Sequence, residues 1–191
     1  MNDGKRAGKT RTIEQVIARR RARLNDRRDA RQLVLRVLFL AAVGYVLATQ
    51  VFLLDQNHGQ DMFPALKDGD LCIAFRTQMQ ALLKQRYVRD DVVAYRHNDR
   101  RRFGRIVATE GDVVNITEAA TLVVNGTPIG NEILFPTDAR EAVEYPCRVP
   151  EGCVFVLGDY RPEATDSRDF GPVPLDSVEG KVITILRRRG L

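Results

Sequence analysis

The sequence predicts a mostly β protein, in which an antiparallel, barrel-like domain is preceded by one transmembrane helix. Three observations carry this prediction. One apolar run of membrane length stands near the start of the 191-residue chain. After residue 65, short apolar segments alternate with turn residues, including the hairpin signal Asn125-Gly126. These segments do not alternate with long helical patterns, as the strands of a parallel sheet would. The length suits one domain with an appendage.

The apolar run predicts a membrane anchor. Residues 33–54 contain a single charge, Arg36, and the uncharged part from Val37 to Leu54 is 18 residues long. A hydrocarbon core of ~30 Å needs about 20 helical residues, and an arginine at the helix end can extend its charge to the interface. A cleavable signal peptide would have a shorter apolar stretch and a small-residue cleavage site, which residues 50–55 (QVFLLD) lack. We therefore predict a transmembrane helix over residues 33–54.

Basic charge is concentrated before this helix. Residues 1–36 hold 12 of the 30 Lys and Arg residues but only 4 of the 25 Asp and Glu residues, so the remainder is slightly acidic. A nucleic-acid-binding protein would carry basic charge on its folded domain, so no nucleic-acid partner is predicted. The positive-inside rule predicts a single-pass protein of the cell membrane, with a basic cytoplasmic tail (residues 1–32) and an extracytoplasmic β domain (residues 55–191).

Strand-length segments fill the predicted β domain. A turn signal at residues 67–70 (KDGD) precedes the first of them. Residues 77–86 are expected to form a short helix or a loop, and residues 130–152 mainly a loop. Asn125-Gly126 predicts a tight hairpin, because both turn positions require positive φ. The predicted strands are residues 71–75, 91–95, 103–109, 113–116, 121–124, 154–157 and 181–186.

Four short motifs occur in order along the chain. They are residues 59–66 (GQDMFPAL), 90–95 (DDVVAY), 104–112 (GRIVATEGD) and 158–168 (GDYRPEATDSR). Together they resemble the motif boxes of the type I signal peptidases (family S26), membrane serine proteases that remove signal peptides with a Ser/Lys pair. The resemblance covers residues 37 to about 185 and implies the β fold of that family. The fourth box is the most specific, with structural roles implied for its matching residues Gly158, Asp159, Asp166, Ser167 and Arg168.

The departures from this family pattern fall on its chemistry. Asp61 stands at the position of the nucleophilic serine, Gly104 at that of the lysine general base, and Ala164 at that of the serine that hydrogen-bonds the lysine. A Ser/Lys mechanism needs a neutral, desolvated lysine beside the hydroxyl that it deprotonates. An aspartic dyad would need a second carboxyl ~3 Å from Asp61. The candidates in the sequence are Asp159 and Asp166, and Asp166 is expected to pair with Arg168. No catalytic residue is therefore predicted.

A peptide-binding fold is what remains. In the family, an extended substrate adds beside the strands that carry the nucleophile and the lysine. Loss of the lysine side chain is expected to widen that groove, and Asp61 to favour a basic or amide-bearing residue opposite it. A simpler interpretation of Asp61 is a surface carboxylate neutralised by a nearby arginine. Residues 100–102 (RRR) are expected to form a solvated strand end. The resemblance implies a peptide-binding set of Asp61, Met62, Phe63, Pro64, Gly104, Arg105 and Ile106.

The two substituted positions also point to a subfamily. Degenerate signal peptidase homologues with aspartate and glycine at these positions occur in pilus loci of Gram-positive bacteria, where they assist sortase-driven pilus assembly without proteolysis, and this sequence resembles them. The resemblance implies an assembly factor or chaperone whose partners are secreted pilin or preprotein segments and a sortase. Two alternatives stay open: an active signal peptidase with a non-standard site, and a membrane scaffold without a ligand. The sequence contains no metal-ligand spacing and no cofactor motif.

Two of the three cysteines lie close together in the sequence. Cys147 and Cys153 flank a segment in which Pro150-Glu151-Gly152 favours a turn. On an oxidising side of the membrane, such a turn would bring the two residues within bridging distance. The alternative is two separate core cysteines, because free cysteine is commonly buried.

Overall fold

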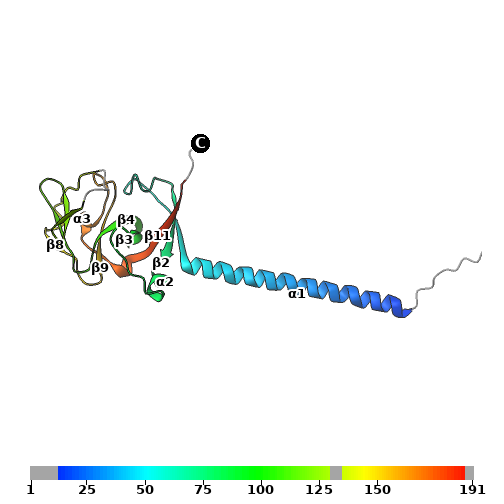
Figure 1. The fold of residues 1–191 in the computed structure, drawn as a ribbon. Coiled ribbons are helices and arrows are strands. Elements are labelled where there is room, and N and C mark those ends of the chain that lie inside the picture. Colours follow the sequence, from blue (N-terminus) through cyan, green and yellow to red (C-terminus); the bar gives the residue numbers. More distant parts are fainter. Residues whose placement is uncertain (1–12, 130–134, 188–191) are drawn as a thin grey trace, which may run out of the picture. The chain divides into compact units, whose positions relative to one another are not determined.

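The computed structural model describes residues 13–129 and 135–187, although in residues 13–28 the only side chain described is that of Ile17. The chain divides into two compact units, Met1–Ala48 and Thr49–Leu191. Helix α1 (Ile13–Val51) accounts for the secondary structure of the first unit, and the second unit is mostly β (Figure 1).

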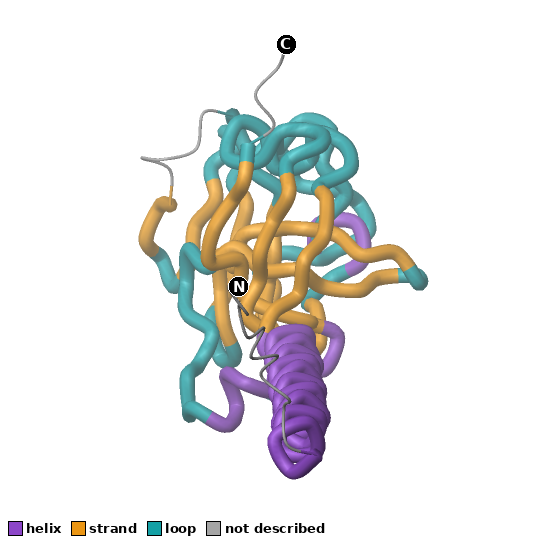
Figure 2. The backbone as a smooth tube through the Cα atoms, turned by 90° about the vertical axis from the view of Figure 1, so that its right-hand side faces the viewer, coloured by secondary structure: helices purple, strands orange, loops and turns teal. Residues whose placement is uncertain are grey.

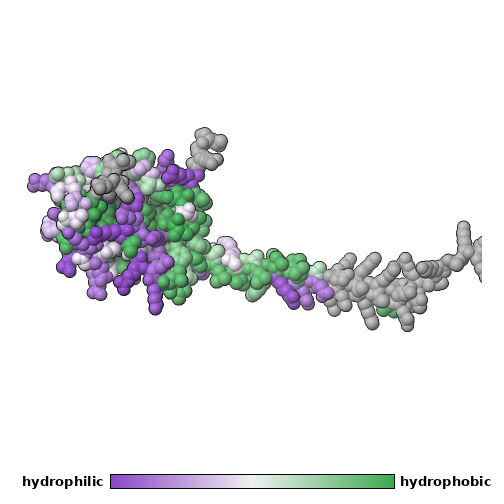
Figure 3. All heavy atoms as spheres, in the orientation of Figure 1, coloured by the Kyte–Doolittle hydropathy of each residue, from purple (hydrophilic) through white to green (hydrophobic). Residues whose placement is uncertain are grey.

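Helix α1 carries the apolar run. Its segment Asp29–Val51 has 23 residues and a mean hydropathy of 1.9, and none of its apolar window is buried. Apolar residues cover most of this part of the helix in the space-filling view, and hydrophilic residues gather at its N-terminal end (Figure 3). The segment is long and apolar enough to cross a membrane, which agrees with the predicted anchor.

The helix ends at Val51, earlier than the predicted Leu54. Residues Phe52, Leu53 and Leu54 instead begin strand β1 (Phe52–Gln56). Leu53 is buried in an apolar cluster that includes Met62. The apolar run therefore serves two elements. Its last residues belong to β1, where Leu53 needs to be apolar because it packs in the core of the β domain.

Two antiparallel sheets form the second unit. One has seven strands in the order β1-β2-β11-β3-β4-β9-β10, and the other has four in the order β7-β6-β5-β8. Figure 2 shows the strands in orange, joined by long loops. The architecture confirms the predicted mostly antiparallel β domain after one N-terminal helix. Beyond β1, the elements are β2 (Leu71–Arg76), α2 (Thr77–Leu82), β3 (Val92–His97), β4 (Arg100–Thr109), β5 (Val113–Ile116), β6 (Leu122–Val124), β7 (Thr127–Ile129), β8 (Cys147–Arg148), β9 (Cys153–Leu157), α3 (Ser167–Phe170), β10 (Val173–Pro174), the 3-10 helix η1 (Leu175–Ser177) and β11 (Val178–Leu186).

Every predicted strand lies in an observed strand or overlaps it by all but one residue. Asn125 and Gly126 have φ angles of 51° and 80°, so they form the tight turn of the β6–β7 hairpin. Strands β1 and β10 and helix α3 were not predicted. Part of the predicted loop, residues 130–134, lies outside the described residues.

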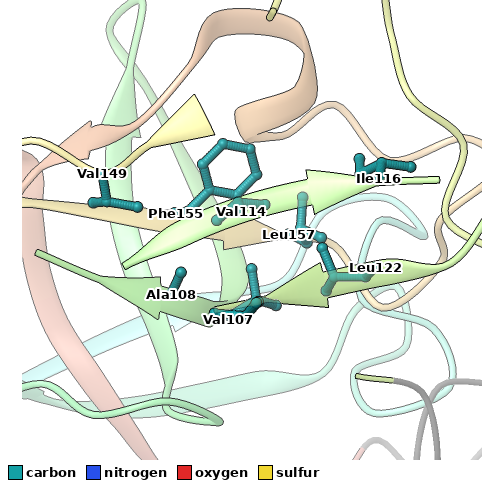
Figure 4. Close-up of a cluster of buried hydrophobic side chains, with 9 residues drawn as sticks. Val107, Ala108, Val114, Ile116, Leu122, Val149, Phe155 and Leu157 are labelled. Atoms are coloured by element: carbon teal, nitrogen blue, oxygen red, sulfur yellow. The ribbon is translucent and has the colours of Figure 1, made fainter. Parts of the chain in front are cut away.

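The main core lies between the two sheets. Figure 4 shows Val107 and Phe155 of the seven-stranded sheet packed with Val114 and Leu122 of the four-stranded sheet. These side chains are among the most buried of the domain. The small sheet therefore covers one face of strands β4 and β9, which also carry residues of the candidate site.

Of the two arrangements considered for Cys147 and Cys153, the disulfide is not formed in the structure, and both residues are free thiols. Cys147 lies in β8, which pairs with β5 in the four-stranded sheet, whereas Cys153 begins β9 in the seven-stranded sheet. The segment between them crosses from one sheet to the other instead of closing a hairpin. Both side chains pack against the same core, as the alternative interpretation proposed.

Candidate functional site

Asp61 lies in a loop that contacts the rest of the domain both before and after this residue. At its base, the amide of Asn57 donates to the carbonyl of Asp70 over 2.8 Å. Beyond Asp61, Met62 and Leu66 are fully buried in the core. These contacts fix the main chain on both sides of Asp61, in the loop that follows strand β1.

The fourth motif packs directly on the main chain of Asp61. The amide of Tyr160 donates to the Asp61 carbonyl over 2.9 Å. A Cβ atom added at Gly158 would lie 2.6 Å from that carbonyl oxygen and 2.3 Å from Cβ of Ala164. Only glycine permits this approach, so Gly158 brings together two of the three positions where the chain departs from the Ser/Lys pattern.

Gly104, the third of these positions, is buried in strand β4 opposite Val93. A Cβ atom added here would lie 2.4 Å from Cγ1 of Val156 and 3.2 Å from Cε1 of Tyr95. A valine from the neighbouring strand β9 therefore fills the space through which a lysine side chain would leave the backbone. The expectation of a groove widened at Gly104 is wrong for this reason.

Asp61 pairs with Arg102, with 3.3 Å between Oδ2 and Nη1. Burial raises the pKa of the Asp61 carboxyl and the charge of Asp166 adds to this, while Arg102 opposes it. The arginine that neutralises Asp61 thus comes from the protein itself, as the simpler interpretation stated. The expected preference of Asp61 for a basic ligand residue loses its basis.

The raised pKa makes the stability depend on pH through Asp61. The folded protein holds this proton more tightly than the unfolded chain does. Ionisation therefore costs stability as the pH rises through the unfolded value, near 3.8, and then through the raised folded value. We expect Asp61→Asn to be more stable than the parent at pH 7. The two proteins should be equally stable at a pH low enough for Asp61 to be protonated in both the folded and the unfolded parent. Thermal unfolding from about pH 3 to pH 7 checks this. If the variant is less stable at pH 7, the ion pair with Arg102 stabilises the ionised Asp61 by more than burial destabilises it.

The rest of the fourth motif forms a buried polar network. Asp166 and Arg168 pair over 2.9 Å with side chains that are each 1% exposed. The second oxygen of Asp166 accepts from the amide of Gly158 over 3.0 Å. The Ser167 hydroxyl accepts from the amide of Val156 over 3.0 Å. The network joins helix α3 to strand β9 and to the loop that packs on Asp61.

A second charge pair ties the fourth motif to strand β4. Arg105 donates two hydrogen bonds, of 2.8 and 2.7 Å, to the carboxylate of Asp159. The pair is mostly shielded from solvent. This geometry holds Arg105 in a structural position.

An open groove of about 480 Å³ lies beside Asp61. In the described part of the chain, β1 pairs only with β2, and Arg100–Gly104 of β4 pairs only with β3. Both strands that line the groove therefore have one unpaired edge. The lining residues are Asp55, Gln56, Asn57, His58, Asp61, Arg96, Asp99, Arg100, Arg101, Arg102 and Phe103.

Only Asp61 of the predicted peptide-binding residues lines this groove. Met62 and Ile106 are fully buried in the core, and Phe63 borders a separate pocket with Tyr160. The arginines of residues 100–102 were expected to be solvated, yet Arg101 pairs with Asp55 over 3.0 Å and also with Glu179. The six predicted residues that do not line the groove are Met62, Phe63, Pro64, Gly104, Arg105 and Ile106.

Comparisons with known proteins agree with the motifs. The family model described as "Signal peptidase, peptidase S26" matches residues 30–186. The chain belongs to the signal peptidase family. It is 31% identical to a signal peptidase I of Bacillus caldolyticus over 75% of this chain and 85% of that protein. It is 39% identical to a probable thylakoidal processing peptidase 2 of Arabidopsis thaliana over 41% of this chain and 21% of that protein. A solved signal peptidase I from Enterococcus faecalis V583 matches with a TM-score of 0.44 and 31% identity, over 52% of this chain and 98% of that one.

The resemblance aligns Asp61, Gly104 and Ala164 with the family's nucleophile, its base and the hydroxyl that supports the base. Of these three residues, Asp61 lines the groove and the other two do not. Within the described ranges, no group of three or more His, Cys, Asp and Glu side chains is arranged to hold a metal ion. The chemistry present in the groove is ion pairing and main-chain hydrogen bonding.

Proposed function

We propose that this signal peptidase homologue is a non-catalytic, membrane-anchored binder of extended peptide segments, and that it serves as an assembly factor or chaperone for sortase-dependent pilin subunits. The observation that carries the loss of catalysis is the contact at Gly104. Val156 fills the space of a base side chain, while Arg102 neutralises the carboxylate at the nucleophile position.

The unpaired strand edges support peptide binding. An extended peptide can add to a sheet edge through main-chain hydrogen bonds, which need no catalytic side chain. The groove has such an edge on β1 and another on the first half of β4. The buried Nε of Arg102 has no hydrogen-bond partner, and a carbonyl of an added strand would supply one.

The apolar segment of α1 and the basic residues before it support a membrane-anchored protein whose β domain lies outside the cytoplasm. The apolar segment of α1 suits one membrane crossing, and the 12 basic residues before Val37 favour the cytoplasmic side for the N-terminus. The β domain then faces secreted proteins. The proposal that pilin subunits and a sortase are the partners is based on the resemblance to the pilus-assembly homologues at Asp61 and Gly104.

The competing function, an active peptidase with a non-standard site, has less support. Asp61 would need a carboxyl partner to act as an aspartic dyad. The charge of Asp166 raises the pKa of Asp61, but Asp166 is itself bound to Arg168 in the buried network. Asp61 is bound to Arg102, so each carboxylate is held by its own arginine.

The first test is a cleavage assay with the full chain in detergent micelles. We expect no cleavage of a preprotein with an intact signal peptide over many hours, beside a signal peptidase I that cuts it under the same conditions. The matched control is Asp61→Asn, which must give the same result. Cleavage by the parent that Asp61→Asn abolishes would establish the competing function.

The second test concerns the strand edges. We expect an extended segment of a secreted subunit to bind, and the same peptide with alternate backbone amides methylated to bind at least about tenfold more weakly, because it cannot complete the ladder. Both methylation registers are tested by titration calorimetry. Equal affinity of all three peptides would exclude strand addition.

A further inference from the structure

A second pocket lies on the β domain and shares no lining residue with the groove beside Asp61. Its volume is about 530 Å³. Helix α2 and the segment after it form one wall, and the ends of strands β4 and β9 with η1 form the others. The lining residues are Thr77, Gln80, Ala81, Gln85, Arg86, Tyr87, Thr109, Glu110, Cys153, Val154, Leu175 and Asp176.

The pocket is lined by a buried amide whose oxygen lacks a hydrogen-bond partner. Gln80 is 3% exposed, and its Oε1 atom has no hydrogen-bond partner. Leaving such an acceptor unpaired is unfavourable, so a lining residue of this kind favours a ligand that brings a donor. Ala81, Val154 and Leu175 supply apolar surface in the same pocket.

The other polar groups also present acceptors. The Thr77 hydroxyl donates its single proton to the carbonyl of Val178. The Tyr87 hydroxyl, 2.7 Å from that of Thr77, must therefore donate to it and keep its lone pairs for other donors. Burial raises the pKa of Tyr87, so this proton stays in place.

Carboxylates dominate the charge of the pocket. One oxygen of Glu110 accepts from the amide of Gly152 over 3.0 Å, and Asp176 also lines the pocket. Arg86 is the one cation among its lining residues. The pocket thus combines apolar surface with an excess of acceptors and of negative charge, whereas the groove beside Asp61 is rich in arginine.

We propose that this pocket binds a lysine side chain of an extended polypeptide partner. The four-carbon stem packs on Ala81, Val154 and Leu175, and the ammonium group donates to Gln80, the Tyr87 oxygen and the carboxylates of Glu110 or Asp176. A side chain with an apolar stem and three N–H donors matches this lining. The site goes beyond the proposed function, because it uses neither Asp61 nor the unpaired strand edges.

The probe is the peptide acetyl-Gly-Lys-Gly-amide, titrated into the full chain in detergent micelles with labelled methyl groups. We expect shifts of the Ala81, Val154 and Leu175 methyl signals. Peptides with norleucine or Nε-acetyl-lysine in place of lysine should bind at least about tenfold more weakly, because charge-assisted donors are lost. Equal affinity for the three peptides, or shifts confined to other parts of the domain, would overturn the proposal.

Substitutions in the pocket and in the groove beside Asp61 test which of the two binds the lysine peptide. Asp176→Asn, an exposed change that leaves the fold intact, should weaken lysine binding about five- to tenfold. Gln80→Met should weaken it similarly. The matched control Asp61→Asn, in the other groove, should leave the affinity unchanged. Loss of binding in Asp61→Asn alone would assign the peptide to the groove, and full binding by Asp176→Asn and Gln80→Met together would reject the pocket.

Discussion

Replacing Asp166 with alanine is expected to lower the free energy of unfolding by about 3–5 kcal/mol, because it leaves a buried charge without its partner. Arg168 is 1% exposed and Arg161 is fully buried. Burial lowers the pKa of Arg161 to about 10, and the charge of Asp166 opposes that shift. Removing Asp166 therefore leaves two buried guanidinium groups whose positive charges repel each other without the carboxylate that offsets them. A loss of this size is a large part of the stability of a typical domain.

Denaturant unfolding of the purified protein in detergent checks this prediction. The matched control is Arg96→Ala, which breaks an exposed pair with Glu179 and should cost at most about 1 kcal/mol. Asp166→Asn should fall between them, since the amide can still accept from Gly158 but carries no charge. Equal losses for Asp166→Ala and Arg96→Ala would mean that the network contributes little to stability.

The fold could be predicted from the sequence wherever the pattern is local. Asn125-Gly126 specified its hairpin because the two residues alone determine the turn. Strand β1 could not be found in this way. Phe52 has the same apolar character as the helix before it, and its strand partner is Phe75, which is distant in sequence. The boundary between helix and strand therefore depends on tertiary contacts.

The sequence predicted the neighbourhood of Asp61, but not which other residues line the groove beside it. The motif at residues 158–168 gave the neighbourhood of Asp61, because Gly158 allows a close approach that other residues would block. The local sequence around Gly104 does not show that Val156 packs against it, since the two residues lie on different strands. Strand alternation sends Arg101 toward Glu179 and Arg102 toward Asp61, and a run of three arginines does not reveal that division.

Restoring the Ser/Lys pattern alone is expected to leave the protein inactive, whereas one further change should give activity. Asp61→Ser, Gly104→Lys and Ala164→Ser supply the nucleophile, the base and the supporting hydroxyl. The new lysine would begin 2.4 Å from Cγ1 of Val156, so it cannot reach its position unless the Val156 side chain moves. Adding Val156→Ala removes that methyl group. We expect the fourfold variant to cleave a preprotein at least about 10²-fold faster than the threefold variant, which is the low end of what a positioned general base contributes.

Single changes cannot substitute for this combination, because groups that act as a unit in catalysis are strongly non-additive. Val156→Ala alone is the control and should stay inactive, since it leaves Asp61 paired with Arg102. The measurement is the initial rate of preprotein cleavage for the parent and the three variants, each first checked for folding by thermal unfolding. If the folded threefold variant cuts as fast as the fourfold variant, Val156 is not the obstacle at Gly104. If only the fourfold variant cuts, the missing Ser/Lys side chains and the packing of Val156 at Gly104 together account for the proposed lack of catalysis.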